Sequence, residues 1–454
     1  MSSDALSVAR AALEAAGEPE AEALAHVETS GLARFADSEV HQPTLIENVV
    51  TMLRVVREGR VGVATTNRVN DEGHAELASR AAGAADAAPV DVDFPGLAHP
   101  APLPAVEGFD EATARLGPEE QARLAGEAIA AADLPVYGFF TSGVSELALA
   151  STTGLAATQR MTDAVALVIA AAEGRSGYAE ATSWRAGDID PAAVARQASE
   201  KAARTEGAHE LQPGAYAAVL EPYAFADLLQ YFAYDSFGAL GLLEERGYLS
   251  NRIGEKVFDS TISIVDDPLD ERGLPKAFDF EGSPKRVVEL VTEGVARGVV
   301  WDRKTANRAR NGTSTTGHAP VPAAADWGPL PYALSVAGGE AESLDELVDR
   351  VGDGIYVTRL HYLGVVDPRN GVITGMTRDG TFRIRGGRIA EPLVNLRFTI
   401  AFPELLHEVY ALTRDATLVN ASDFYGERYP HGSLVPGLAT AHFNVTGTGS
   451  GPGI

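Results

Sequence analysis

The most constraining feature of this sequence is a change of pattern at residues 207–214. Before it, Ala-rich helical segments alternate with pairs of strand-like stretches, and after it most segments are short β-branched runs. The change ends in Gln212-Pro213-Gly214, a turn-forming tripeptide that suits a boundary. The sequence therefore predicts an α+β protein, with a helix-and-hairpin N-terminal domain (residues 1–210) and a larger β-rich C-terminal domain (residues 211–454).

The periodicity of apolar residues places the individual elements. In the N-terminal part, helices are predicted over 5–26, 71–87, 118–133 and 191–206, and strands over 28–64, 136–149 and 155–172. In the C-terminal part, strands are predicted over 216–220, 261–265, 286–291, 356–366, 381–385 and 388–398, and helices over 222–237, 344–351 and 403–412. Asp379-Gly380 and Gly386-Gly387 are typical of hairpin turns. The proline-dense stretch 89–104 is predicted to be a long crossing loop.

Charge and hydropathy exclude two classes of partner. The chain has 63 acidic and 37 basic residues, a formal net charge of -26, so electrostatic binding to nucleic acid is disfavoured. The longest apolar run, residues 164–172, is far shorter than the roughly 18 residues of a membrane span. Residues 1–10 lack the basic and apolar regions of a secretory signal. We expect a cytoplasmic protein that binds neither nucleic acid nor membrane.

The sequence contains no cysteine, which removes disulfides, thiolate nucleophiles and every cysteine-based metal site. None of the ten histidines has another histidine three, four or five residues away, so no helical turn presents two imidazoles to one metal. A site assembled from scattered residues such as Asp266, His318 and His361 stays open. The carboxylates of Asp279 and Glu281 could do acid-base chemistry, but a buried structural pairing is the interpretation that we favour.

Several ordered segments together resemble the TldD/PmbA (TldE) family of peptidases. They run in the family's order from about residue 30 to residue 400 and so cover nearly the whole chain. The segments are Leu32–Gln42, Arg57–Asn67, Ala150–Gly154, Gln212–Tyr216, Asp279–Gly282, Trp301–Ala306 and Thr315–Gly317. The ordered set, more than any single segment, carries the resemblance.

The resemblance implies two kinds of subunit. TldD-like chains carry a helix with H-E-x-x-x-H and a distant cysteine that together hold zinc, whereas TldE/PmbA-like chains lack this set and pair with TldD. Here the corresponding helix places Gln230 and Asp235 at the two histidine positions and Tyr231 at the glutamate position. An amide is a weak zinc ligand, and a phenol with a pKa near 10 is a poor base at neutral pH. With no cysteine as third ligand, these degenerate metal-site positions indicate the TldE/PmbA kind.

The implied function is therefore indirect. We expect no catalytic residue, no metal ligand and no cofactor in this chain, with zinc held by a TldD-like partner subunit in a heterodimeric metallopeptidase. The chain would form part of the chamber that receives extended peptides, which hairpin-rich proteins can capture by strand addition. A homodimer without the partner stays open. The alternatives are an autonomous metal-dependent hydrolase with a non-standard ligand set, and a regulatory binding protein.

Overall fold

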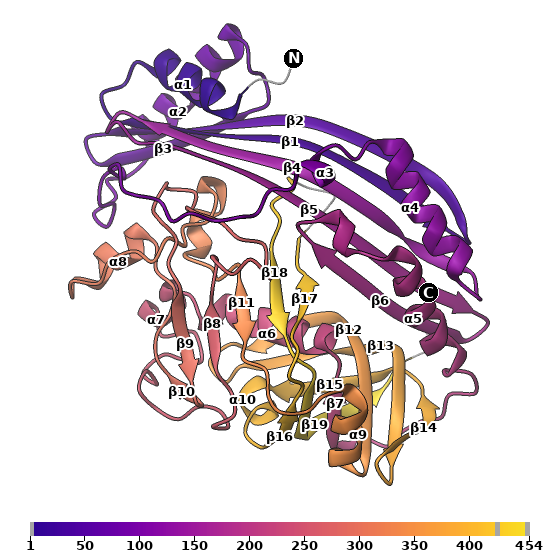
Figure 1. The fold of residues 1–454 in the computed structure, drawn as a ribbon. Coiled ribbons are helices and arrows are strands. Elements are labelled where there is room, and N and C mark those ends of the chain that lie inside the picture. The colour runs from indigo at the N-terminus through magenta and orange to yellow at the C-terminus, as the bar shows by residue number, and fades with distance from the viewer. Residues whose placement is uncertain (1–3, 423–426, 450–454) are drawn as a thin grey trace.

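A computed structural model describes residues 4–422 and 427–449. Its first half forms one six-stranded antiparallel sheet in the order β3-β2-β1-β4-β5-β6, which Figure 1 shows as a long arched layer above the rest of the chain. The strands are β1 (Ala21–Ala36), β2 (Glu39–Arg57), β3 (Arg60–Thr66), β4 (Val136–Ser151), β5 (Ala156–Ala172) and β6 (Arg175–Ser183). All six belong to residues 21–183, so this sheet is built from the N-terminal part alone.

Helices cover one face of this sheet, and the opposite face meets the second half of the chain. The helices are α1 (Ala5–Ala16), α2 (Asp71–Ala87), the short α3 (Glu111–Ala114), α4 (Pro118–Ala131) and α5 (Pro191–Ala203). Small residues such as Ala23 and Ala25 face α1 and α2, while Leu24 between them faces the other way and packs with Phe278 and Phe280. This alternation, with a period of two, gives the sheet two buried faces.

The second half contains two further sheets. A seven-stranded sheet comprises β7 (Gly214–Leu220), β12 (Gly354–Asp367), β13 (Val372–Arg385), β14 (Arg388–Leu393), β15 (Leu396–Ala401), β16 (Val409–Leu412) and β19 (Leu438–Thr448). Because β12 also pairs with β13, the strands β12-β7-β19-β15-β13 close on themselves. The six-stranded sheet comprises β8 (Ile264–Asp266), β9 (Val288–Thr292), β10 (Val295–Ala296), β11 (Leu334–Val336), β17 (Thr417–Asn420) and β18 (Gly432–Val435). The predicted α+β class, with a larger β-rich second part, is confirmed.

Two of the helices in the second half match the helices predicted over 222–237 and 344–351. The helices of the second half are α6 (Pro222–Ser236), α7 (Ala239–Leu243), α8 (Arg303–Ala309), α9 (Leu344–Val351) and α10 (Phe402–Leu405). The helix predicted over 344–351 begins and ends as predicted, and Ser343 caps its start by accepting a hydrogen bond from the Glu346 N–H at 3.3 Å. Among the described residues, no helix combines the length and the apolar character that a membrane crossing requires.

Four predicted elements are wrong. The single strand predicted over 388–398 is two strands, β14 and β15, separated by Val394 and Asn395. The helix predicted over 5–26 ends at Ala16, where Gly17 adopts a left-handed conformation (φ 60°), and residues from Ala21 onward pair with β2 and β4. The helix predicted over 403–412 stops at Leu405, because Val409–Leu412 pair with β19. Asp379-Gly380 is not a hairpin turn. It is an irregularity inside β13, with positive φ at both residues, while Gly386-Gly387 does connect β13 to β14.

Candidate functional site

The helix α6 carries all three degenerate metal-site positions. It follows β7 directly, and Pro222 occupies its first turn, where the missing N–H costs nothing. Its apolar face, which includes Phe225, Leu228 and Phe232, is buried in the largest hydrophobic core. Gln230, Tyr231 and Asp235 are only partly buried, and of the three Tyr231 packs against the border of that core.

The side chains at these positions already have partners. Gln230 donates from Nε2 to the Tyr234 hydroxyl at 3.0 Å, and the rings of Tyr231 and Tyr234 meet edge to face with centroids 6.0 Å apart. The Asp235 carboxylate accepts a hydrogen bond from Arg246 Nη1 at 2.6 Å. The carboxylate at the second ligand position is therefore paired with the guanidinium of Arg246.

The ligand set considered for an autonomous hydrolase comes together only in part. Asp266 Oδ1 lies 2.7 Å from His318 Nε2, but His361 belongs to β12, where its ring lies against Tyr362 with centroids 4.0 Å apart. Across residues 4–422 and 427–449, no three Asp, Glu or His side chains form a group that could hold a metal ion. Asp266 and His318 thus form a pair without a third ligand.

The Asp266–His318 pair is completely buried, with no exposed surface on either side chain. The imidazole Nε2 lies 2.7 Å from Asp266 Oδ1 and its Nδ1 lies 2.9 Å from the Thr316 hydroxyl, so both ring nitrogens have a hydrogen-bond partner. Burial, together with the charge of Lys285, lowers the pKa of His318. Burial alone would raise the pKa of Asp266, but His318 and Lys285 outweigh it, so the carboxyl is ionised. This is a satisfied internal pair that solvent does not reach.

A second buried cluster connects the long sheet to the loop that carries Asp279 and Glu281. Glu22 on β1 accepts from Arg54 on β2 at 2.5 Å, and Glu281 lies 3.6 Å from the same guanidinium. Asp279 accepts hydrogen bonds from the N–H groups of Glu281 (3.0 Å) and Ser283 (2.9 Å). Burial raises the pKa of Asp279 to about 6 and those of Glu22 and Glu281 to about 7. Asp279 and Glu281 are thus both buried, as the structural pairing that we favour from the sequence requires.

Glu22 gives the first testable prediction. Its folded-state pKa lies above the ordinary 4.5, so the folded protein holds a proton that the unfolded chain releases, and this contribution to stability disappears as pH rises towards 7. The free energy of unfolding of Glu22→Gln, relative to wild type, should therefore rise by up to about 3 kcal/mol between about pH 5 and 8. Urea unfolding across this range measures the difference. The exposed Glu72→Gln is the matched control, and a pH-independent difference for Glu22→Gln would contradict the prediction.

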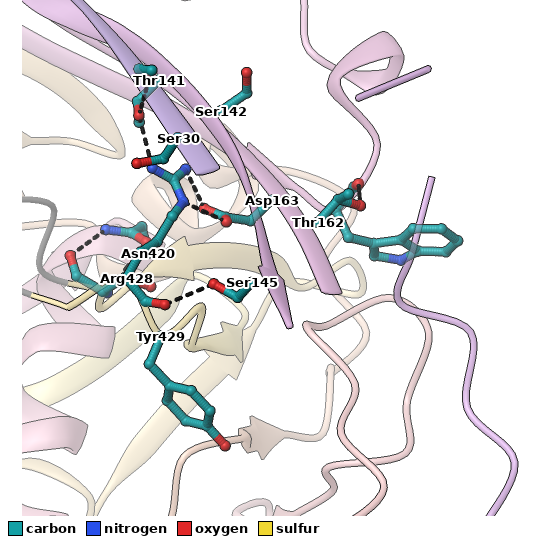
Figure 2. Close-up of polar contacts among 12 residues, drawn as sticks. Ser30, Thr141, Ser142, Ser145, Thr162, Asp163, Asn420, Arg428 and Tyr429 are labelled. Atoms are coloured by element: carbon teal, nitrogen blue, oxygen red, sulfur yellow. Dashed lines mark hydrogen bonds and ion pairs between the residues drawn. The ribbon is translucent and has the colours of Figure 1, made fainter. Parts of the chain in front are cut away.

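A third buried ion pair joins the end of the chain to the long sheet. Arg428 donates two hydrogen bonds of 2.7 Å each, from Nε and Nη2, to the Asp163 carboxylate on β5. The side chains of Arg428 and Asp163 are 3% and 1% exposed. Figure 2 shows the guanidinium pointing into the strands, where Nη1 also donates to the Thr141 hydroxyl at 2.9 Å. The Arg428 carbonyl accepts from the Ser145 hydroxyl at 2.7 Å. Both side chain and main chain of Arg428 are thus anchored to the sheet.

The sequence did not predict this ion pair, although Asp163 could be recognised as a charged residue in an apolar strand. Asp163 is the one charged residue between Met161 and Ala172, and a lone charge inside a buried strand needs a partner. The partner follows 265 residues later, and no local pattern indicates it. The pair fixes the segment that presents Tyr429 and His431, whose rings both contact Tyr332.

Comparisons with known proteins match three successive parts of the chain to one family. Models of PmbA/TldA metallopeptidase domains match at residues 21–87 (domain 1), 112–206 (central domain) and 213–447 (C-terminal domain). The structure of TldE from Thermococcus kodakarensis is similar, with a TM-score of 0.84 at 18% identity over 97% of this chain and 99% of that one. At this identity the likeness establishes a shared fold.

Two archaeal relatives are named metalloproteases. The one from Methanothermobacter thermautotrophicus is 26% identical over 265 residues, which cover 56% of this chain and 55% of that protein. The one from Archaeoglobus fulgidus is 27% identical over 187 residues, which cover 39% of this chain and 41% of that protein. The chain thus spans about half or less of the length of the curated relatives that it matches. Because the C-terminal domain model alone matches more than half of the residues, the chain belongs to the PmbA/TldA metallopeptidase family, which is the TldD/PmbA family that its motifs resemble.

Proposed function

We propose that this chain is the non-catalytic, TldE-like subunit of a cytoplasmic heterodimeric zinc metallopeptidase. It pairs with a TldD-like subunit, which holds the zinc, and forms part of the chamber in which extended peptides are cut. The observation that carries the proposal is the Asp235–Arg246 ion pair, since a metal ion beside Asp235 would face a fixed guanidinium at 2.6 Å from the carboxylate. The fold shared with the Thermococcus kodakarensis TldE supports it.

The side chains on α6 do not fit a zinc ion. Gln230 offers a neutral amide whose nitrogen is committed to Tyr234, and Tyr231 offers a phenol where a carboxylate base would be needed. The role that suits such a face is to line and shape a chamber with hydrogen-bonding and aromatic groups, while the chemistry occurs on the partner. The buried Asp266–His318 pair argues against autonomous hydrolysis, because a substrate would have to reach groups with no exposed surface.

Reconstitution tests this proposal. The chain purified alone should contain no stoichiometric zinc and cleave no peptide, and mixing with the TldD-like subunit recovered from the native cell should give a one-to-one complex that does both. Removing zinc with a chelator should abolish the cleavage. Stoichiometric zinc and peptidase activity in the isolated chain would defeat the proposal. A stable native partner without a zinc motif would favour the regulatory alternative.

A substitution of Tyr231, tested in the complex, distinguishes a residue that lines the chamber from a catalytic residue. Tyr231→Phe removes only the hydroxyl, so the kcat of the complex should change less than about tenfold, whereas loss of a general acid or base costs about 10²–10⁴-fold. Gln230→Ala serves as the neighbouring control on the same helix face. A drop of a hundredfold or more with Tyr231→Phe would place a catalytic group in this chain.

A further inference from the structure

A groove runs between the crossing loop (residues 88–110) and the first half of β5. Figure 1 shows this loop, in dark violet, passing beneath the long sheet towards α3. The groove has a volume of about 630 Å³ and is open to solvent. That volume lies within the roughly 300–1,000 Å³ of ordinary ligand sites. Its walls are Leu103–Phe109 of the loop, Thr158–Arg160 of β5, and Ala277.

The β5 wall of the groove is an unpaired strand edge. The hairpin partner β6 pairs with β5 only from Ala164 onward, so residues 156–163 have a strand neighbour on the β4 side alone. The Thr162 N–H points away from β4 and donates to the Gly108 carbonyl at 2.9 Å. Main-chain groups alternate in direction along a strand, so those of Thr158 and Arg160 point the same way, into the groove. In the described part of the chain, no hydrogen bond reaches them.

The loop wall is held apart from this edge. Its two ends are fixed, because the Thr153 hydroxyl donates to the Ala98 carbonyl at 2.5 Å and the Asp110 N–H donates to the Thr162 hydroxyl at 3.0 Å. Between these ends, Pro104 has no N–H to offer to a neighbouring strand. Among the described residues, the loop makes one main-chain hydrogen bond to this edge, from the Thr162 N–H to the Gly108 carbonyl, and a gap with hydrogen-bonding groups on the strand side remains.

The side chains around the gap are fixed as well. Gln159, which alternates with the two exposed residues and is buried, donates to the Pro275 carbonyl at 3.1 Å and accepts from the Ala277 N–H at 2.8 Å. The Arg160 guanidinium lies over the Phe109 ring, 3.9 Å from its centroid. This cation–π contact holds the charged group against the groove wall. The remaining lining is mixed, with apolar Leu103 and Val106 beside polar Glu107 and Thr158.

We propose that this groove binds an extended peptide, which adds as a short strand to the free edge of β5. Two successive outward-facing residues, about 6.8 Å apart, present N–H and C=O groups at the spacing of a neighbouring strand. A peptide main chain satisfies both, and main-chain bonds supply the affinity, so recognition depends little on sequence. The inference deepens the proposed function and rests on it for the source of the peptide, the substrate of the heterodimer.

Proline at Thr158 tests the binding mode directly. Thr158→Pro removes the N–H that points into the groove, and proline is tolerated at an outward-facing position of an edge strand. Thr158→Val keeps the N–H and is the matched control. With a fluorescein-labelled heptapeptide of alternating valine and threonine, fluorescence anisotropy should show at least about tenfold weaker binding to Thr158→Pro and wild-type binding to Thr158→Val. Equal affinity of both variants and wild type would overturn the proposal.

A second probe covers the case in which Thr158→Pro does not fold. The same heptapeptide, N-methylated at its central residues, cannot donate to β5 and should bind wild-type chain at least about tenfold more weakly. Unchanged affinity would overturn strand addition. Self-association that Thr158→Pro abolishes would assign the groove to a second copy and equally overturn it. The assays use the isolated chain, so peptide binding can succeed even if no TldD-like partner binds, and heterodimer formation by Thr158→Pro can succeed even if the groove fails.

Discussion

Replacing Asp163 by alanine is expected to lower the free energy of unfolding by about 3–5 kcal/mol, because it leaves the Arg428 guanidinium buried without its counter-charge. The cost comes from the desolvated arginine that stays behind, since the net value of a buried ion pair is itself small. Urea unfolding at neutral pH measures it. Hydrogen exchange of residues 427–431 should rise at the same time, because this segment loses its ion pair with β5.

A double-mutant cycle gives the control for this result. Arg428→Met leaves Asp163 as the unpaired charge and should be similarly destabilising, whereas the double variant removes both charges and should recover much of the loss. At the surface, Glu72→Ala breaks the exposed pair with Arg68 and should cost less than about 1 kcal/mol. Additive effects of the two single changes would show that the buried pair does not act as a unit.

Asp266→Ala is the second large effect that we expect, again about 3–5 kcal/mol. Asp266 accepts from His318 Nε2 at 2.7 Å and from the Ala333 N–H at 2.9 Å, and both donors are left without an acceptor in the variant. An orphaned buried donor costs about 1–3 kcal/mol, and Lys285 loses a counter-charge in addition. Thermal and urea unfolding should both show the change.

The neighbouring Asp267→Ala is the matched control. It removes only the acceptor for the Leu269 N–H and should cost about 1 kcal/mol. Asp266→Asn keeps one oxygen acceptor and should fall between the two. If Asp266→Ala were as mild as Asp267→Ala, the buried pair would be dispensable for folding. Peptidase activity of the complex should then decide whether it has another use.

Local signals in the sequence predicted the elements whose ends are set by neighbouring residues. The helix α2 begins and ends as predicted, because Asn70 accepts from the Gly73 N–H at 2.9 Å and the following residues form regular helical turns. The same reasoning failed for residues 21–26 and 409–412, which have helix-compatible composition but pair with strands far along the chain. Tertiary pairing overrides intrinsic propensity, which differs by less than about 1 kcal/mol among ordinary residues.

The candidate site shows the same division. The motif resemblance located Gln230, Tyr231 and Asp235 on one helix, and the residue types alone indicated poor metal ligands. Arg246, which pairs with Asp235 across the end of α6, carried no signal in the sequence. The free edge of β5 was equally hidden, because the lengths of β5 and β6 appear only when the hairpin has formed.

By itself, the sequence determined the chemical inventory of this protein: no thiol, a charge of -26, and no helical pair of imidazoles, together with the helices that begin at a cap. The tertiary structure alone decided which charges share a buried site, as with Asp163 and Arg428, and which strand edge stays open. The physical reason is the distance along the chain over which each kind of interaction acts. Capping and periodicity act over a few residues, whereas a buried charge or an unpaired amide is satisfied by whatever the folded chain brings within about 3 Å of it.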